Sequence, residues 1–401
     1  MPTEPHKQTV FQPKIVENPV SIDDTKLAEQ LANYDVLGIV TPEYNCCVQK
    51  VIGEMAPYLK GGHGIAPVMA FDPDPKKIIE SIPDWIMYLR AGVKQGEPIP
   101  YLAMLDAHIP VFRGLGLEVY YYLDDALFFI NNMAPLKLMW SCDKIIVATD
   151  ALAEFLIENQ KMPKPIYMLK THMDLPSFDR CTVPLYLIDQ KKFNILFTSQ
   201  GRIGALMLRR ILEEMNKTPT KYANVNMIIV SAWVGQMRTI VNEFRGIKKT
   251  YWEWMPLLEH YGLTKAVQLI IAPGEEGDLE GQVEPELQHI WIHAKSCLKY
   301  TLAGAARKPV IASPMNEYEK SIKNGETGFL ANTLKEWMEY IDLCINDKDL
   351  CQKIGEAARK DVEQNWHIKD RARQFAEIFR GSNECLVQGI DHAVKEETIP
   401  I

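Results

Sequence analysis

Two adjacent carboxylates follow an apolar run in the first half of the chain. Asp124 and Asp125 come directly after Leu117–Leu123, whose length and tyrosine content predict a β-strand. Carboxylates at a strand end can bind ligand hydroxyls, and one within hydrogen-bond reach of a hydroxyl can act as a general base. The alternative is a helix N-cap for the segment that follows. We expect one carboxylate to cap and the other to face a ligand.

A serine and a lysine stand at the start of a predicted helix in the second half. Ser296 fits an N-cap, which places Lys299 in the first helical turn. Free N–H groups at a helix start and a nearby ammonium both attract anions. Alone, the pair would be an ordinary cap beside a solvated lysine. Ser313 adds to it, because it ends the apolar run Pro309–Ala312, and open α/β sheets bind ligands at such strand ends.

The segment "FTSQGRIGA" is a second candidate for anion binding. Gly201 and Arg202 follow the predicted strand Phe193–Thr198. A glycine lets the backbone approach a phosphate, and an arginine can bind it with two hydrogen bonds. Turns of this kind also occur without any ligand, so the interpretation as a phosphate loop and as a plain turn both stay open.

These residues must be held by two sets of alternating strands and helices. Short apolar runs without alternation predict strands covered on both faces, as in a parallel sheet. The first set is Val36–Val40, Ile65–Phe71, Trp85–Leu89, Leu117–Leu123, Lys144–Ala148 and Pro165–Leu169. The second set is Phe193–Thr198, Asn226–Val230, Val267–Ala272 and Pro309–Ala312. The pattern predicts an α/β protein with two doubly wound sheets.

Helix signals fit the same scheme. Apolar residues from Val48 to Leu59 predict a helix ended by Gly61-Gly62, and Thr333 with Glu336 predicts a capping box. We expect an extended arm over 1–23, a first domain over 24–187, a second over 188–365, and a terminal helix and tail over 366–401. The stretch "DLPSFDRCTVPLYLIDQKK" is expected to be an irregular connector.

Composition narrows the class of protein. The 401 residues are 47% hydrophobic and 24% charged, with a formal net charge of −8, as in an ordinary globular protein without a broadly basic surface. Eight scattered cysteines without a CxxC pair indicate reduced thiols and a cytoplasmic location. The polar amino terminus is unlike a signal peptide, and no apolar run approaches the roughly 18 residues needed to span a bilayer. We expect no transmembrane segment and no metal, since metal-ligand spacing is absent.

The stretch from Ser296 to Ala331 resembles the carboxyl-terminal domain of retaining glycosyltransferases of the family 4 type, which have the two-domain GT-B fold. The family pattern is roughly S-x-L-K-x-x-E-x-x-A-x-G-x-P-V-I-A-S, followed by a tyrosine, an isoleucine and a glycine turn. The residues that match are Ser296, Leu298, Lys299, Ala305, Pro309–Ser313, Tyr318, Ile322, Gly325, Thr327-Gly328 and Trp337. A fainter resemblance covers roughly residues 35–380, with Arg90 and Asp124-Asp125 at the ends of family-like strands.

The resemblance implies a function. The donor would be a nucleoside diphosphate sugar, bound through Gly201, Arg202, Ser296, Lys299 and Ser313 without a tightly bound cofactor. The acceptor would be a hydroxyl group, facing Tyr44, Asn45 and Arg90, with Asp124 and Asp125 as the catalytic carboxylates. Tyr44 and Asn45 fit a plain β-to-α turn equally well, and a lone His172 near the domain crossover is more often structural. Glycans, lipid-linked sugars, proteins and hydroxylated DNA bases are all acceptors of GT-B enzymes, and the net negative charge mildly disfavours DNA.

One departure from the pattern concerns the donor. The family glutamate that contacts the donor's ribose is replaced by Leu302, and Gly304 and Arg307 also depart from the commonest pattern. A carboxylate of the loop before this helix would then take over, with Glu284 or Glu286 expected ahead of Glu276. The other interpretations are that the nucleotide is held differently or that the site is degraded.

Two rival functions follow. A degraded site would leave a non-catalytic nucleotide- or carbohydrate-binding protein on a glycosyltransferase scaffold, and Leu302 is the feature that favours it. A two-domain sugar-nucleotide epimerase has similar architecture, but the serine- and glycine-rich signature before a glutamate pair is absent.

Overall fold

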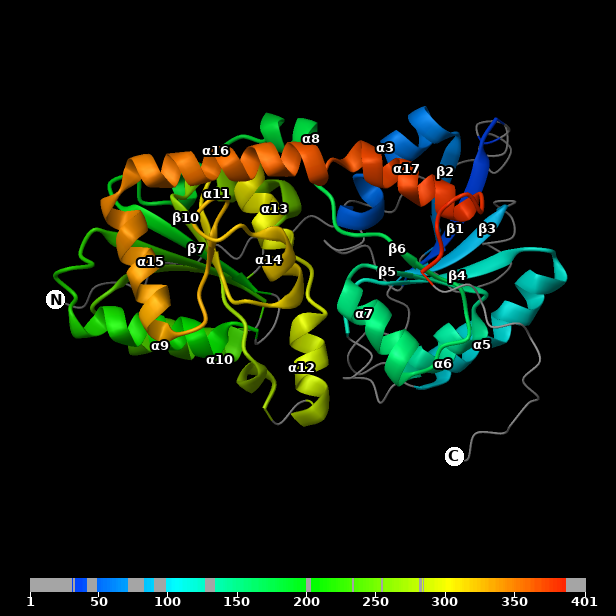
Figure 1. Cartoon of the computed structure of the whole chain (residues 1–401), viewed down its shortest axis with the longest axis horizontal. Coiled ribbons are helices and arrows are strands. Elements are labelled where there is room, and N and C mark those ends of the chain that lie inside the picture. The colour runs from blue at the N-terminus through cyan, green and yellow to red at the C-terminus, as the bar shows by residue number, and fades with distance from the viewer. Residues whose placement is uncertain are drawn as a thin grey trace, which may run out of the picture.

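The computed structural model describes residues 31, 33–41, 49–70, 83–89, 99–126, 134–199, 203–232, 234–253, 255–280, 283 and 285–386. These residues form two parallel sheets of six strands each (Figure 1). We call the sheet β1–β6 with its helices the first unit, and the sheet β7–β12 with its helices the second unit. The predicted α/β architecture of two doubly wound sheets is confirmed.

The first sheet has the order β2-β1-β3-β4-β5-β6, and all its described pairs are parallel. Its strands are β1 (Asp35–Val40), β2 (Ile65–Ala70), β3 (Trp85–Leu89), β4 (Glu118–Leu123), β5 (Lys144–Val147) and β6 (Ile166–Met168). Its helices are α3 (Ala56–Tyr58), α5 (Ile99–Gly114), α6 (Ala134–Ser141) and α7 (Asp150–Glu154). Most of the residues in these strands are buried, which explains why continuous apolar runs predicted them.

The second sheet has the order β12-β11-β10-β7-β8-β9 and is also parallel. Its strands are β7 (Phe193–Ser199), β8 (Val225–Ser231), β9 (Lys248–Trp252), β10 (Leu269–Ala272), β11 (Val310–Ala312) and β12 (Phe329–Leu330). The helices are α8 (Leu175–Arg180), α9 (Ala205–Lys217), α10 (Val234–Glu243), α11 (Leu257–Ala266), α12 (Pro285–His293), α13 (Leu298–Ala305), α14 (Asn316–Ser321), α15 (Leu334–Asn346) and α16 (Lys348–Asn365). The Thr333–Glu336 capping box of α15 is confirmed.

Two local expectations were wrong, and the edge strands of the second sheet were missed. The described part of the expected helix, residues 49–59, is no single helix, because π-helical turns at Gln49–Gly53 and Leu59–His63 flank the short α3. The segment ends at Gly64 with φ of 68° rather than at Gly61-Gly62. The expected irregular connector contains α8, capped by Asp174. Strands β9 and β12 at the two edges of the second sheet were not predicted, because KKTYW lacks an apolar run and β12 is only two residues long.

Helix α13 lies very close to α16, which explains one departure from the family pattern. A Cβ atom on Gly304 would come within 2.6 Å of Val362 Cγ2 and 2.8 Å of the Ala358 carbonyl oxygen. A larger residue at 304 would therefore push the two helices apart. The other departure, Arg307, has a φ of 54°, in the left-handed region that favours the glycine of the pattern.

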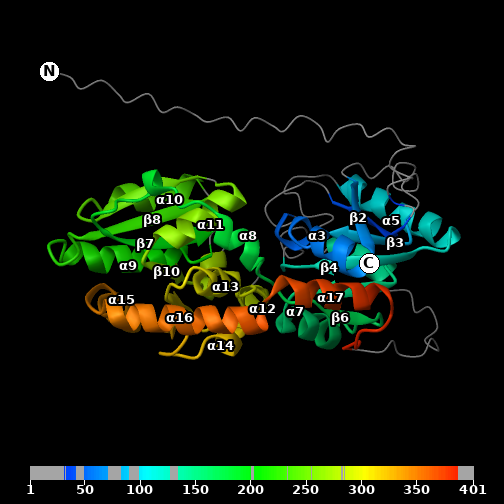
Figure 2. The ribbon, with the colours of Figure 1, turned by 90° about the horizontal axis from the view of Figure 1, so that it is seen from above.

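The chain crosses between the units twice, and the two crossings are hydrogen-bonded to each other. After β6 it runs to α8, and after α16 it returns as α17 (Ile368–Phe379), which packs on the first sheet (Figures 1 and 2). The Met173 N–H donates to the Trp366 carbonyl at 2.8 Å, and the Ile368 N–H donates to the Met173 carbonyl at 3.2 Å. The boundaries of the domains at 187 and 365 stay predictions. None of the described helices is long and apolar enough to cross a membrane.

Candidate functional site

The carboxyl end of β4 meets the second unit through an ion pair. Asp125 accepts hydrogen bonds from Lys295 Nζ at 2.6 Å (Oδ1) and 2.7 Å (Oδ2), and each side chain is 21% exposed. Asp125 Oδ1 also accepts from the N–H of the next residue, Ala126. The helix expected to follow lies largely outside the described residues, so the cap by one carboxylate stays a prediction. Asp124 lies half-buried beside it. The predicted acidic strand end thus lies where the two units meet.

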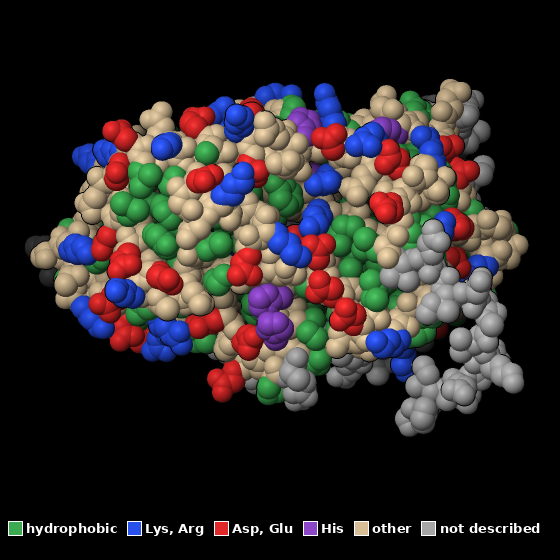
Figure 3. Space-filling view, viewed as in Figure 1, with side chains coloured by type: hydrophobic (Ala, Val, Ile, Leu, Met, Phe, Trp, Pro, Cys, Tyr) green, Lys and Arg blue, Asp and Glu red, His purple; other side chains and the backbone are tan. Residues whose placement is uncertain are grey.

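Lys295 was missed by the sequence analysis. It lies in the short segment between α12 and α13, with its ammonium 5.2 Å from the centre of the Trp291 ring. Lys295 could have been predicted as a site residue, because it lies only three residues before Leu298, at the start of the helix that was predicted to bind an anion. On the face shown in Figure 3, Lys and Arg side chains gather along the junction of the two units, with Asp and Glu beside them.

Lys299 is the second cation of this region. It is half-buried in the first turn of α13, and burial together with the charge of Lys295 lowers its pKa to about 8. Among the residues that the structure describes, no carboxylate forms an ion pair with it. Burial and then Lys299 lower the pKa of His260 to about 4, so this imidazole is neutral beside the ammonium. Lys299 is therefore a candidate to bind an anionic ligand.

The predicted cap of α13 was wrong in detail. Cys297, not Ser296, is the N-cap residue, and no side chain caps the helix. Ser296 is half-buried just before it. The Cys297 side chain makes no cap hydrogen bond, so among the described residues no capping side chain accepts from the first N–H groups of α13. The positive end of the helix lies in the same turn as Lys299.

Ser313 follows β11, as predicted, but it acts within the protein. Its Oγ accepts a hydrogen bond from the Gly274 N–H at 3.0 Å, and the residue is 7% exposed. This contact joins the loops after β10 and β11. The structure thus gives Ser313 a role in shaping the sheet edge, and direct donor contact stays a prediction.

A buried aspartate occupies the start of α9. Asp278, 2% exposed, accepts from the N–H groups of Gly204 (2.6 Å), Leu206 (3.1 Å) and Glu275 (3.0 Å). Gly204 has φ of 84°, and a Cβ there would lie 2.6 Å from the Pro273 carbonyl oxygen. Because a carboxylate already holds these N–H groups, this helix start is a poorer anion site than that of α13. This role of Asp278 could not be predicted, because the contacts join residues 204 and 278, which are 74 positions apart.

Several predicted site residues lie outside the described residues: Tyr44, Asn45, Arg90, Gly201, Arg202 and Glu284. Glu286 lies in α12, and its side chain is not described. Glu276 is exposed and accepts from His289 Nδ1 at 2.8 Å. Leu302 is 4% exposed in the hydrophobic core, so the position of the family glutamate is apolar here.

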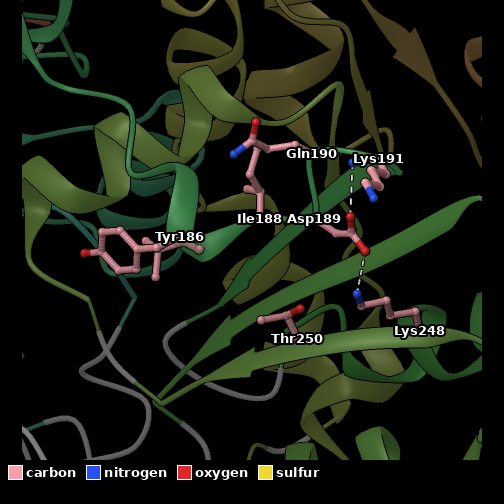
Figure 4. A pocket seen from close by; sticks show the side chains of 8 residues that line it. Tyr186, Ile188, Asp189, Gln190, Lys191, Lys248 and Thr250 are labelled. Carbon is pink, nitrogen blue, oxygen red and sulfur yellow. Dashed lines mark hydrogen bonds and ion pairs between the residues drawn. The ribbon is translucent and has the colours of Figure 1, made fainter.

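A separate pocket of about 570 Å³ lies near the amino-terminal ends of β7 and β9 (Figure 4). Within it, Asp189 pairs with Lys248 at 2.5 Å and accepts from the Lys191 N–H at 3.0 Å. Parallel sheets bind ligands at the opposite, carboxyl edge. We therefore place the candidate site at Asp125, Lys295 and Lys299.

Comparisons with known proteins agree with this fold. No family model matches the chain, and no curated protein matches it in sequence. HepE from Anabaena, solved in complex with UDP and glucose, has a TM-score of 0.59 at 12% identity, covering 87% of this chain and 100% of that chain.

Two further solved structures are similar. A glycosyltransferase from Rickettsia africae has a TM-score of 0.57 at 17% identity, covering 87% of this chain and 99% of that one. A sucrose-phosphate synthase from Thermosynechococcus elongatus has a TM-score of 0.60 at 11% identity, covering 86% of this chain and 98% of that one. With its two parallel six-stranded sheets, the chain has the GT-B fold.

Proposed function

We propose that this protein transfers a sugar from a nucleoside diphosphate sugar to a hydroxyl acceptor, with retention of configuration and without a metal. The observation that carries the proposal is the half-buried Lys299 beside Lys295 at an uncapped helix start. A leaving diphosphate requires positive charge and N–H dipoles in this arrangement. HepE has the same fold and was solved with UDP, which makes UDP the first nucleotide to test.

The ion pair between Asp125 and Lys295 suggests how the site changes when donor binds. Without donor, Asp125 neutralises Lys295. A diphosphate carries more charge than one carboxylate and would draw Lys295 toward it. Asp125 is then released from the ion pair and, beside Asp124, orients the acceptor hydroxyl. In this proposal Gly201 and Arg202 help to hold the phosphates, Glu284 or Glu286 holds the ribose, and Tyr44, Asn45 and Arg90 face the acceptor.

A second candidate is a nucleotide-binding protein without catalysis. The burial of Leu302 favours it, since the position of the family glutamate cannot accept a hydrogen bond from a ribose. The two candidates predict the same nucleotide binding and differ only in turnover.

A two-step measurement tests the proposal. UDP, GDP, ADP and CMP are first compared by thermal shift, and we expect a diphosphate to stabilise the protein most. Sugar nucleotides of that base are then incubated without acceptor. Slow release of the free nucleoside diphosphate supports a transferase, because such enzymes hydrolyse donor in the absence of acceptor. Stabilisation without any release favours the binding protein, and no stabilisation by any of the nucleotides contradicts both.

The pKa of Lys299 gives a pH dependence. Burial and Lys295 lower this pKa to about 8, and only the charged ammonium attracts a diphosphate. The charged form dominates at pH 7 and is lost as the pH rises through 8. UDP affinity should therefore fall about tenfold between pH 7 and pH 9, while uridine affinity stays constant. Calorimetry at both pH values checks this, and an unchanged fall in a Lys299→Ala variant would assign the effect to another group.

A further inference from the structure

A buried polar cluster joins the two units beside the chain crossings. It consists of Lys50, Glu54, His172 and Tyr261. The first two lie in the helical segment after β1, His172 lies in the crossing after β6, and Tyr261 lies in α11 of the second unit. All four are buried or nearly so: Lys50 is 5% exposed, His172 3%, Tyr261 0%, and the Glu54 side chain 9%.

Hydrogen bonds among three of these side chains, those of Lys50, Glu54 and Tyr261, form a closed ring. Lys50 Nζ donates to Glu54 Oε2 at 2.7 Å and to the Tyr261 hydroxyl oxygen at 2.8 Å. The Tyr261 hydroxyl donates its own proton to Glu54 Oε1. Each of these three side chains contacts the other two, so removing one takes a hydrogen-bond partner from each of two buried polar groups.

Protonation states agree with these contacts. Burial alone would raise the pKa of Glu54, but the charge of Lys50 and the contact with His172 lower it to about 2. Burial raises the pKa of Tyr261 well above its usual value, which keeps the hydroxyl proton in place. Burial also lowers the pKa of His172, so its ring is neutral and Nε2–H donates to the Lys50 carbonyl at 2.8 Å.

The cluster also reaches the crossing segment itself. Met173 Sδ lies 3.9 Å from Lys50 Nζ, and the next residue, Asp174, accepts from the Tyr58 hydroxyl at 2.9 Å. Met173 is the residue whose backbone is hydrogen-bonded to the returning chain at Trp366 and Ile368. The ring of side chains thus lies on the place where both crossings meet.

We infer that Lys50, Glu54, His172 and Tyr261 form a clasp that couples the two units at the chain crossings. The clasp is distinct from the ion pair of Asp125 and Lys295, which is more exposed at 21% and open to competition by an anion. The clasp is too deeply buried for such competition. The inference needs no substrate and does not rest on sugar transfer.

Hydrogen exchange followed by mass spectrometry tests the clasp in the full chain. Tyr261→Phe removes only the hydroxyl. We expect the amides of Met173 and Ile368 to exchange about tenfold faster, the factor that corresponds to about 1.4 kcal/mol. The matched control is Tyr222→Phe, because Tyr222 is also buried and donates to a carboxylate, Asp342, at 2.9 Å within the second unit. This control should leave exchange at the crossing unchanged.

A double-substitution cycle separates coupling from general loosening. Lys50→Met and Tyr261→Phe alter opposite units, and if the clasp joins them their effects on exchange will not add. Additive effects, equal acceleration by Tyr222→Phe, or no acceleration by Tyr261→Phe would each overturn the inference. Should Tyr261→Phe fail to fold, Glu54→Gln keeps the size of the side chain and is expected to give the same acceleration.

Discussion

UDP should bind Lys299→Ala protein about ten- to a hundredfold more weakly than the unchanged protein, while uridine binding changes little. A hydrogen bond to a charged group contributes roughly 1.5–3 kcal/mol, which corresponds to that loss. Lys299 is half-buried and has no carboxylate partner among the described residues, so a phosphate would be its main partner. Isothermal calorimetry with UDP and uridine at pH 7 measures both affinities.

The matched control is Lys335→Ala. Lys335 lies in the first turn of α15 in the same unit, and its side chain is 83% exposed. Its removal changes the net charge equally and should leave UDP affinity within about twofold, since exposed charges contribute little. An equal loss of UDP and uridine affinity in Lys299→Ala would show that this lysine does not contact phosphate.

The sheets could be predicted because their strands are buried on both faces. Strand β8, for example, is buried along its whole length and is apolar at most positions. Strand β9 escaped prediction because an edge strand carries lysines and threonine. Propensity and periodicity detect burial: the edge strand β6 has two buried residues and an apolar run, whereas no residue of β9 is fully buried.

The candidate site was only partly predictable. The acidic strand end and Lys299 could be identified from sequence, because each follows or opens a regular element. Lys295 could not be paired with Asp125, since the two are 170 positions apart. Lys50 and Glu54, four residues apart, resemble an ordinary surface pair on a helix, and only the tertiary fold buries them. Contacts between residues far apart in the chain produce no periodic pattern, so a single sequence does not reveal them.

Leu302→Glu should destabilise the protein and leave donor binding no tighter. Leu302 is 4% exposed in the core, where an unpaired carboxylate costs about 3–5 kcal/mol. Leu302→Met is the matched control, because it keeps an apolar side chain of similar volume and should cost less than about 1.5 kcal/mol. Urea unfolding measures both free energies, and calorimetry with UDP measures binding in the variants that fold.

Calorimetry with UDP on two further variants decides which residue holds the ribose. If a carboxylate of the segment before α13 has replaced the family glutamate, Glu284→Gln or Glu286→Gln should weaken UDP binding at least several-fold, since each removes one charged acceptor. Leu302→Glu would then only add a second carboxylate near the diphosphate. The opposite pattern, in which Leu302→Glu folds normally, tightens UDP binding and raises turnover while both glutamine variants are neutral, would refute compensation. The ribose contact would then have been lost at Leu302, and the binding protein without catalysis would become the better account of this chain.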